Sequence, residues 1–99
     1  AATDAYRDAR VTVARFVGVA DADRLIFTRG TTESMNLVAS SWGRANVRAG
    51  DEIVITGIEH HANFVPWQQL ARATGATLRI VELTADQTID LSSLRAIVN

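Results

Sequence analysis

The stretch Phe27-Thr28-Arg29-Gly30-Thr31-Thr32-Glu33-Ser34-Met35-Asn36 decides how this chain is interpreted. It predicts an apolar strand that ends in Gly30-Thr31-Thr32 and passes at once into a helix. The first amides of a helix have no intrahelical acceptor, and the helix dipole adds partial positive charge there. A glycine lets the backbone come close to a ligand, and two hydroxyl groups supply further donors. We therefore expect a phosphate group to bind at Thr31 and Thr32; the alternative is that the threonines only cap the helix.

The composition excludes several classes of protein. The 99 residues allow one domain at most, and the apolar and charged fractions, 47% and 21%, are those of an ordinary globular chain. The net charge is −1 and the 10 cationic residues are scattered arginines, which argues against a nucleic-acid partner. The chain has no lysine and no cysteine. These residues therefore supply no Schiff-base lysine, thiolate or disulfide.

The chain also lacks the features of a membrane or secreted protein. No apolar run approaches the roughly 18 residues that cross a bilayer, and the N-terminus has no apolar signal core. We therefore expect a cytoplasmic protein without a membrane partner. The first residue is Ala1 rather than methionine, and the last residues, Val98 and Asn99, fall within an expected helix. We interpret residues 1–99 as a piece of a longer protein, truncated at both ends.

Helical and extended patterns alternate along the chain. The apolar face formed by Tyr6, Ala9, Val13 and Phe16 indicates a first helix. Strands are expected at 25–28, 52–56 and 77–83, and further helices at 32–45, 63–74 and 91–98. This alternation predicts an α/β fold with parallel pairing, in which the strand at 52–56 is apolar enough to be buried on both faces.

Local sequence features predict where the helices begin and end. The expected capping residues are Thr3 or Asp4 for the first helix, Asn63 for the third and Asp90 for the last, with Gly18 and Gly75 as helix stops. Trp42 and Trp67 fall on the apolar faces of their helices, which favours core packing for both.

A second polar motif, Glu59-His60-His61, follows the strand at 52–56. Ligands of α/β sheets bind beyond the carboxyl ends of the strands, so this motif and the Gly30 turn would share one edge. Adjacent histidines point in different directions, and no third ligand stands at metal-site spacing, so no metal is expected. His60 is a polar surface residue, a flat imidazole over a flat ligand, or a proton shuttle. Arg29 binds an anion or, more simply, pairs with Glu33 at the surface.

Taken in order, these motifs resemble a known family. The chain resembles the class V aminotransferases, in particular the SufS-type cysteine desulfurase and selenocysteine lyase group. The motifs that carry the resemblance are Arg29-Gly30-Thr31-Thr32-Glu33, Asn36-Leu37-Val38-Ala39, Gly50-Asp51-Glu52-Ile53-Val54-Ile55, Glu59-His60-His61-Ala62-Asn63 and Val65-Pro66-Trp67. The resemblance covers most of the chain, through Ile89-Asp90-Leu91. It implies that residues 1–99 are a partial large domain of a type I transferase that binds pyridoxal 5′-phosphate.

The resemblance also implies roles for individual residues. Thr31 and Thr32 would hold the phosphate of pyridoxal 5′-phosphate, and His60 would stack on its pyridine ring. Arg29 and Glu33 would lie near the site mouth or a dimer interface. In the family's fold, further strands separate the strand before Gly30 from the strand before Glu59. If that arrangement holds, the two motifs would converge only in a complete protein.

The function implied by the resemblance is removal of sulfur from L-cysteine, giving L-alanine and an enzyme persulfide. A homodimer would pass this sulfur to an acceptor protein of iron–sulfur cluster assembly. The required lysine, cysteine and pyridinium-pairing carboxylate come later in family members, so no catalytic residue is expected here and the segment alone should be inactive. The alternatives are a selenocysteine lyase, an epimerase, a kynureninase-like enzyme, or a non-catalytic phosphate-binding or interaction module. A Ser-x-His-Lys-like segment encoded downstream would favour an enzyme. A stop codon after Asn99 would favour the non-catalytic module.

Overall fold

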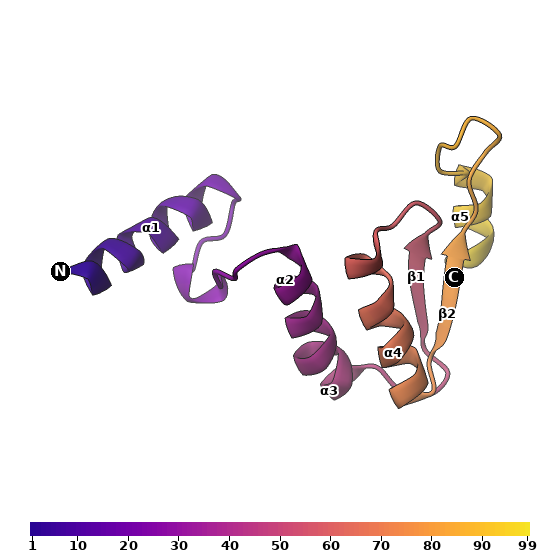
Figure 1. Cartoon of the computed structure of the whole chain (residues 1–99), viewed down its shortest axis with the longest axis horizontal. Coiled ribbons are helices and arrows are strands. Elements are labelled where there is room, and N and C mark those ends of the chain that lie inside the picture. The colour runs from indigo at the N-terminus through magenta and orange to yellow at the C-terminus, as the bar shows by residue number, and fades with distance from the viewer.

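The computed structural model describes all residues from Ala1 to Asn99 as alternating helices and strands. In chain order the elements are α1 (Ala2–Phe16), a 3-10 turn η1 (Ala22–Arg24), α2 (Thr31–Val38), a π-helical segment η2 (Ala39–Gly43), α3 (Arg44–Asn46), β1 (Glu52–Thr56), a 3-10 turn η3 (His61–Asn63), α4 (Val65–Thr74), β2 (Thr77–Val81) and α5 (Leu91–Ile97). Helix α4 lies between α2 and the two strands, α5 lies beyond β2, and α1 stands apart (Figure 1).

Strands β1 and β2 pair in parallel, as the alternating pattern predicted. Glu52 lies opposite Thr77 and the register continues to the pair of Thr56 and Val81. Helix α4 is the crossover between the strands, which is the usual connection in a parallel pair. The buried residues of this unit are Ile55 and Val81 in the strands and Leu70 and Ala71 in α4.

Neither face of this small sheet is fully covered, contrary to the expectation that the strand at 52–56 would be buried on both faces. Val54 is 38% exposed and Ile80 is 45% exposed. The parallel register places Val54 and Ile80 on opposite faces of the pair, so apolar side chains stay in contact with solvent on both sides. The radius of gyration is 16.9 Å, whereas a compact domain of this length has about 13 Å. The chain is therefore less compact than a domain of its length, in keeping with its exposed apolar side chains.

The predicted strand at 25–28 is wrong. These residues are extended at Leu25 but form no ladder with another strand. Arg10 of α1 instead donates from Nε to the Leu25 carbonyl at 3.1 Å and from Nη2 to the Ala22 carbonyl at 2.8 Å. The Tyr6 ring packs edge-on against Phe27, with centroids 5.4 Å apart. An extended segment becomes a strand only through a partner, and here α1 takes its place.

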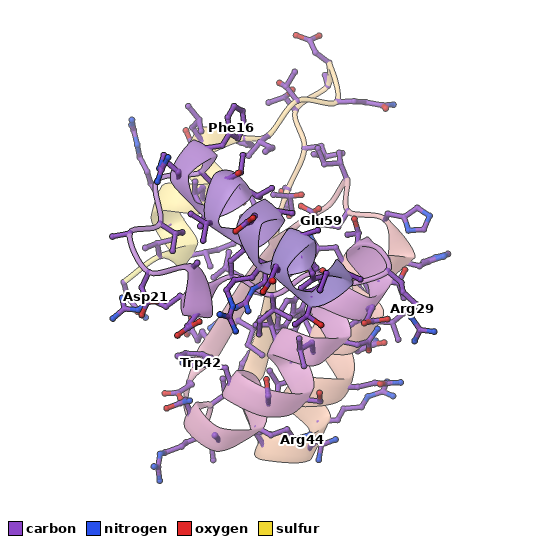
Figure 2. The ribbon with its side chains drawn as sticks, turned by 90° about the vertical axis from the view of Figure 1, so that its left-hand side faces the viewer. Phe16, Asp21, Arg29, Trp42, Arg44 and Glu59 are labelled. Atoms are coloured by element: carbon purple, nitrogen blue, oxygen red, sulfur yellow. The ribbon has the colours of Figure 1, made fainter.

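The predicted helix at 32–45 is correct in place but not in regularity. It begins at Thr31 and widens into the π-helical segment from Ala39 to Gly43. A side chain at Gly43 would lie 2.6 Å from Leu70 Cδ2, so this glycine permits the close approach of α4. Trp42 was expected in the core, but it is 63% exposed and lies at the surface of its helix (Figure 2).

Predictions about helix ends were mixed. Gly18 and Gly75 both have positive φ and end their helices, and Asp90 caps α5 by accepting from two amides of its first turn. The predicted caps Thr3 and Asp4 are wrong, because α1 begins at Ala2 without any side-chain cap. The last strand ends at Val81 rather than at residue 83, and the last helix ends at Ile97 rather than at residue 98. None of the helices combines the length and the apolar character that a bilayer crossing requires.

Candidate functional site

The turn into α2 presents unpaired donors. Its first helical hydrogen bond runs from the Ser34 amide to the Gly30 carbonyl at 3.1 Å. The amides of Thr31, Thr32 and Glu33 precede that bond, and no group in the chain accepts from them. Free amides at a helix N-terminus favour an anionic ligand through both hydrogen bonding and the helix dipole.

The four hydroxyl groups around this turn have two different roles. The Thr28 hydroxyl donates to the Gly30 carbonyl at 3.0 Å and lies 2.6 Å from the Ser34 hydroxyl, which must therefore be the donor in that pair. These two hydroxyls hold the turn in shape. The side chains of Thr31 and Thr32 are exposed and form no hydrogen bond within the chain. They do not cap the helix, because the N-cap is Gly30, so their hydroxyls are available to a ligand.

Gly30 itself is extended, with φ 164° and ψ −179°. Any residue can adopt that backbone conformation, so strain does not require a glycine. A Cβ atom built there meets no protein atom within 4 Å. Neither the backbone nor the packing of residues 1–99 accounts for the glycine, whereas close approach of a ligand would.

Arg29 and Glu33 form the predicted surface pair. Arg29 Nε lies 2.6 Å from Glu33 Oε2, and the Arg29 side chain is 94% exposed. Exposed ion pairs of this kind contribute about 0–1 kcal/mol to stability.

His60 follows β1 and begins the turn η3. Its Nδ1 atom accepts from the Ala62 amide at 3.1 Å, so the proton of the neutral imidazole is on Nε2. Asn63 was expected to cap the third helix, which is wrong, because the N-cap of α4 is Phe64 and no side chain caps it. His60 instead caps the turn η3, and Asn63 is the last residue of that turn. The His60 and His61 rings are tilted by 57° with centroids 6.0 Å apart, so they are not stacked. No group of three or more potential metal ligands occurs in the chain.

A hydrogen-bonded chain of side chains, which sequence reasoning missed, runs behind His60. Thr56 donates to one carboxylate oxygen of Glu59, and Asn63 Nδ2 donates to the other at 3.0 Å. Asn63 Oδ1 in turn accepts from Trp67 Nε1 at 2.7 Å. The bond from Thr56, followed by the bond from Asn63, holds the pKa of Glu59 below its usual value of 4.5. The only signal in the sequence is the spacing of these polar residues by three and four positions.

The two predicted motifs line one cavity of about 790 Å³. Its walls are Arg29, Gly30, Thr31, Thr32, Glu33, His60, Ala62 and Asn63. Helix α2 lies against the turn η3, which brings the free donors and the imidazole together within this chain. The expectation that they converge only in a complete protein is therefore wrong. The volume lies within the roughly 300–1,000 Å³ of small-molecule sites. A planar group carrying an anion matches the chemistry of these walls.

Comparisons with known proteins point to one family. The family model described as aminotransferase class-V matches residues 1–99. A probable cysteine desulfurase of Staphylococcus aureus is 53% identical over 98 residues, which are 99% of this chain and 24% of that protein. The chain thus spans about a quarter of the length of the curated relatives it matches.

Two solved structures share the arrangement of helices and strands. The cysteine desulfurase CsdA of Escherichia coli superposes with a TM-score of 0.85 and 39% identity, over 98% of this chain and 24% of that one. A C-DES mutant with glycine covalently linked to its pyridoxal phosphate cofactor has a TM-score of 0.77 over 98% of this chain and 25% of that one. Its 24% identity shows a common fold only. The homologues with the higher identities are cysteine desulfurases.

Proposed function

Because this chain belongs to the class V aminotransferase family, we propose that it is part of the large domain of a cysteine desulfurase that binds pyridoxal 5′-phosphate. Its 53% identity to a probable cysteine desulfurase and its likeness in fold to CsdA support this assignment. The chain matches about a quarter of those proteins, so the activity proposed is that of a longer enzyme to which residues 1–99 contribute one wall of the site.

One observation carries the cofactor assignment: the free donors of the α2 N-terminus and an exposed imidazole line the same cavity. The phosphate would accept from the amides of Thr31, Thr32 and Glu33 and from the two threonine hydroxyls. A dianion is favoured at this position by the helix dipole as well as by the hydrogen bonds. The open space beside Gly30 leaves room for phosphate oxygens close to the backbone.

His60 would cover the flat face of the cofactor ring. Its Nδ1 is engaged by the Ala62 amide, which leaves Nε2–H as the group that can donate into the cavity. The ring can therefore orient the cofactor by stacking and can hold a proton at Nε2. When bound, pyridoxal phosphate supplies an electron sink for the substrate, while the protein supplies grip and orientation.

The proposed overall reaction breaks the carbon–sulfur bond of L-cysteine. The products are L-alanine and a persulfide on an enzyme cysteine. Residues 1–99 contain neither lysine nor cysteine, so the lysine that holds the cofactor and the cysteine that takes the sulfur belong to other parts of the enzyme. The segment alone would be inactive. We further propose a cytoplasmic homodimer that delivers sulfur to an acceptor protein of iron–sulfur cluster assembly.

The test replaces Thr31 and Thr32 together by valine in the full-length enzyme. Hydrogen bonds to charged groups are worth about 1.5–3 kcal/mol each, so the dissociation constant of pyridoxal phosphate should rise roughly 100-fold or more. The amides remain, so binding is weakened rather than abolished. Thr12→Val is the matched control, since Thr12 lies on α1 and its hydroxyl bonds only to the Asp8 carbonyl. An unchanged cofactor affinity in the double variant would refute the phosphate assignment.

A further inference from the structure

Few backbone hydrogen bonds hold the loop that carries His60. It crosses from the end of β1 to the start of α4 (Figure 1). The Gly57 amide still bonds to the Val81 carbonyl at 3.0 Å, but no backbone carbonyl accepts from the amides of residues 58–62. His60 is exposed, and the only hydrogen bond of its ring within the chain is the one from the Ala62 amide to Nδ1. The turn's own backbone bonds, such as the one from the Asn63 amide to the His60 carbonyl, do not tie it to β1, so side-chain bonds must supply that connection.

Glu59 provides that restraint. It lies immediately before His60 and is only partly exposed (labelled in Figure 2). One carboxylate oxygen accepts from Thr56, the last residue of β1, and the other from Asn63 at the end of the turn η3. Asn63 is fixed in turn by Trp67 Nε1 in the first turns of α4. The carboxylate thus connects the strand, the turn and the helix, with both of its oxygens used.

This brace meets the candidate site at Asn63 without Glu59 reaching it. Asn63 and His60 line the 790 Å³ cavity, whereas Glu59 does not. With Asn63 fixed, the turn from His60 to Asn63 keeps its geometry, including the 2.8 Å bond from the Asn63 amide to the His60 carbonyl. The Ala62 amide is then placed to donate to His60 Nδ1, which sets the orientation and the tautomer of the imidazole.

We propose that Glu59 is a positioning residue: its carboxylate ties β1 to α4 through Asn63 and so fixes the His60 ring at the cavity. This inference rests on the proposed function, because it assumes that the ring at this position covers the cofactor. It adds a residue that touches neither cofactor nor substrate.

The test compares Glu59→Ala, His60→Ala and the double variant in the full-length enzyme, with the visible absorbance band and the dissociation constant of bound pyridoxal phosphate as readouts. We expect Glu59→Ala to shift the band in the same direction as His60→Ala and to weaken cofactor binding by about 5- to 10-fold, the factor that corresponds to one lost hydrogen-bonded restraint. The double variant should equal His60→Ala alone, since coupled residues are not additive.

Glu59→Gln is the conservative control. Its amide oxygen can accept from Asn63 while its NH₂ group donates to the Thr56 hydroxyl, so the brace keeps both connections. Band and affinity should stay close to the parental values. Trp67→Phe removes only the donor at the far end of the chain of bonds, and we expect an intermediate shift. Parental behaviour of Glu59→Ala, or additive effects in the double variant, would overturn the proposal.

A measurement without cofactor separates this inference from the proposed function. Hydrogen exchange at the Ala62 amide, followed by mass spectrometry of the full-length apoenzyme, reports the bond to His60 Nδ1 directly. Faster exchange in Glu59→Ala, but not in Glu59→Gln, would support the brace even if His60→Ala left the cofactor band unchanged. Faster exchange in Glu59→Ala together with an unchanged band in His60→Ala would reject the stacking of His60 on the cofactor but not the brace. Equal exchange in all variants would reject the brace.

Discussion

Gly30→Ala gives the sharpest separation between folding and ligand binding in this chain. The substitution adds one methyl group to a residue whose backbone is extended and whose Cβ position is free of protein atoms within 4 Å. The folded chain therefore gains no clash and no backbone strain. Alanine also has fewer conformations than glycine in the unfolded chain, which should stabilise the fold by about 0.4–1 kcal/mol.

Cofactor binding should move in the opposite direction. If phosphate oxygens occupy the space beside Gly30, the new methyl group competes with them. Overpacking of a fitted site costs roughly 1–3 kcal/mol, which corresponds to about a 5- to 150-fold rise in the dissociation constant of pyridoxal phosphate. The assay is a cofactor titration of the full-length enzyme followed by absorbance, paired with thermal unfolding of the apoenzyme.

The control is Gly57→Ala, because this residue has ordinary contacts, with Leu83 Cγ at 3.5 Å from the added Cβ, and does not line the cavity. It should leave cofactor affinity unchanged. If Gly30→Ala stabilises the apoenzyme as expected but binds the cofactor with parental affinity, the phosphate does not lie against this turn. If Gly30→Ala instead lowers the melting temperature, the open space described beside the residue is wrong.

Two further predictions concern stability. Asp90→Ala removes the side-chain acceptor of two amides at the start of α5 and should destabilise the protein by about 0.5–2 kcal/mol, measured by chemical unfolding; an unchanged midpoint would contradict the capping role. The pKa of Glu59 is lowered in the folded chain by its bonds from Thr56 and Asn63. Its ionised form therefore stabilises the fold above the pKa of the unfolded chain, and this stabilisation is lost as pH falls through the lower folded pKa. The melting-temperature difference between the parent and Glu59→Gln should shrink over that acidic range, and a constant difference would contradict the assignment.

Local chemistry explains which parts of the fold could be predicted. Gly75 can adopt the left-handed conformation that ends α4, and Asp90 can cap α5 whatever surrounds it. The apolar run of β1 likewise predicts a strand from its own residues. The segment at 25–28 has a similar composition but lacks a partner strand, and pairing is a property of two segments. The prediction that Trp42 packs in the core failed for the same reason, because helical periodicity identifies an apolar face but not whether another element covers it.

The candidate site shows the same limit of sequence-based prediction, here for single hydrogen bonds. Four hydroxyl-bearing residues stand within seven positions, and their spacing does not say which will serve the fold. The structure assigns Thr28 and Ser34 to each other and to the Gly30 carbonyl, which leaves Thr31 and Thr32 without partners. A side-chain donor that the fold does not use, beside amides that it cannot use, is available for a ligand at no cost in internal hydrogen bonds. The proposed anion site therefore rests on which donors the fold uses and which it leaves to the cavity, and that division becomes visible only once the turn has formed.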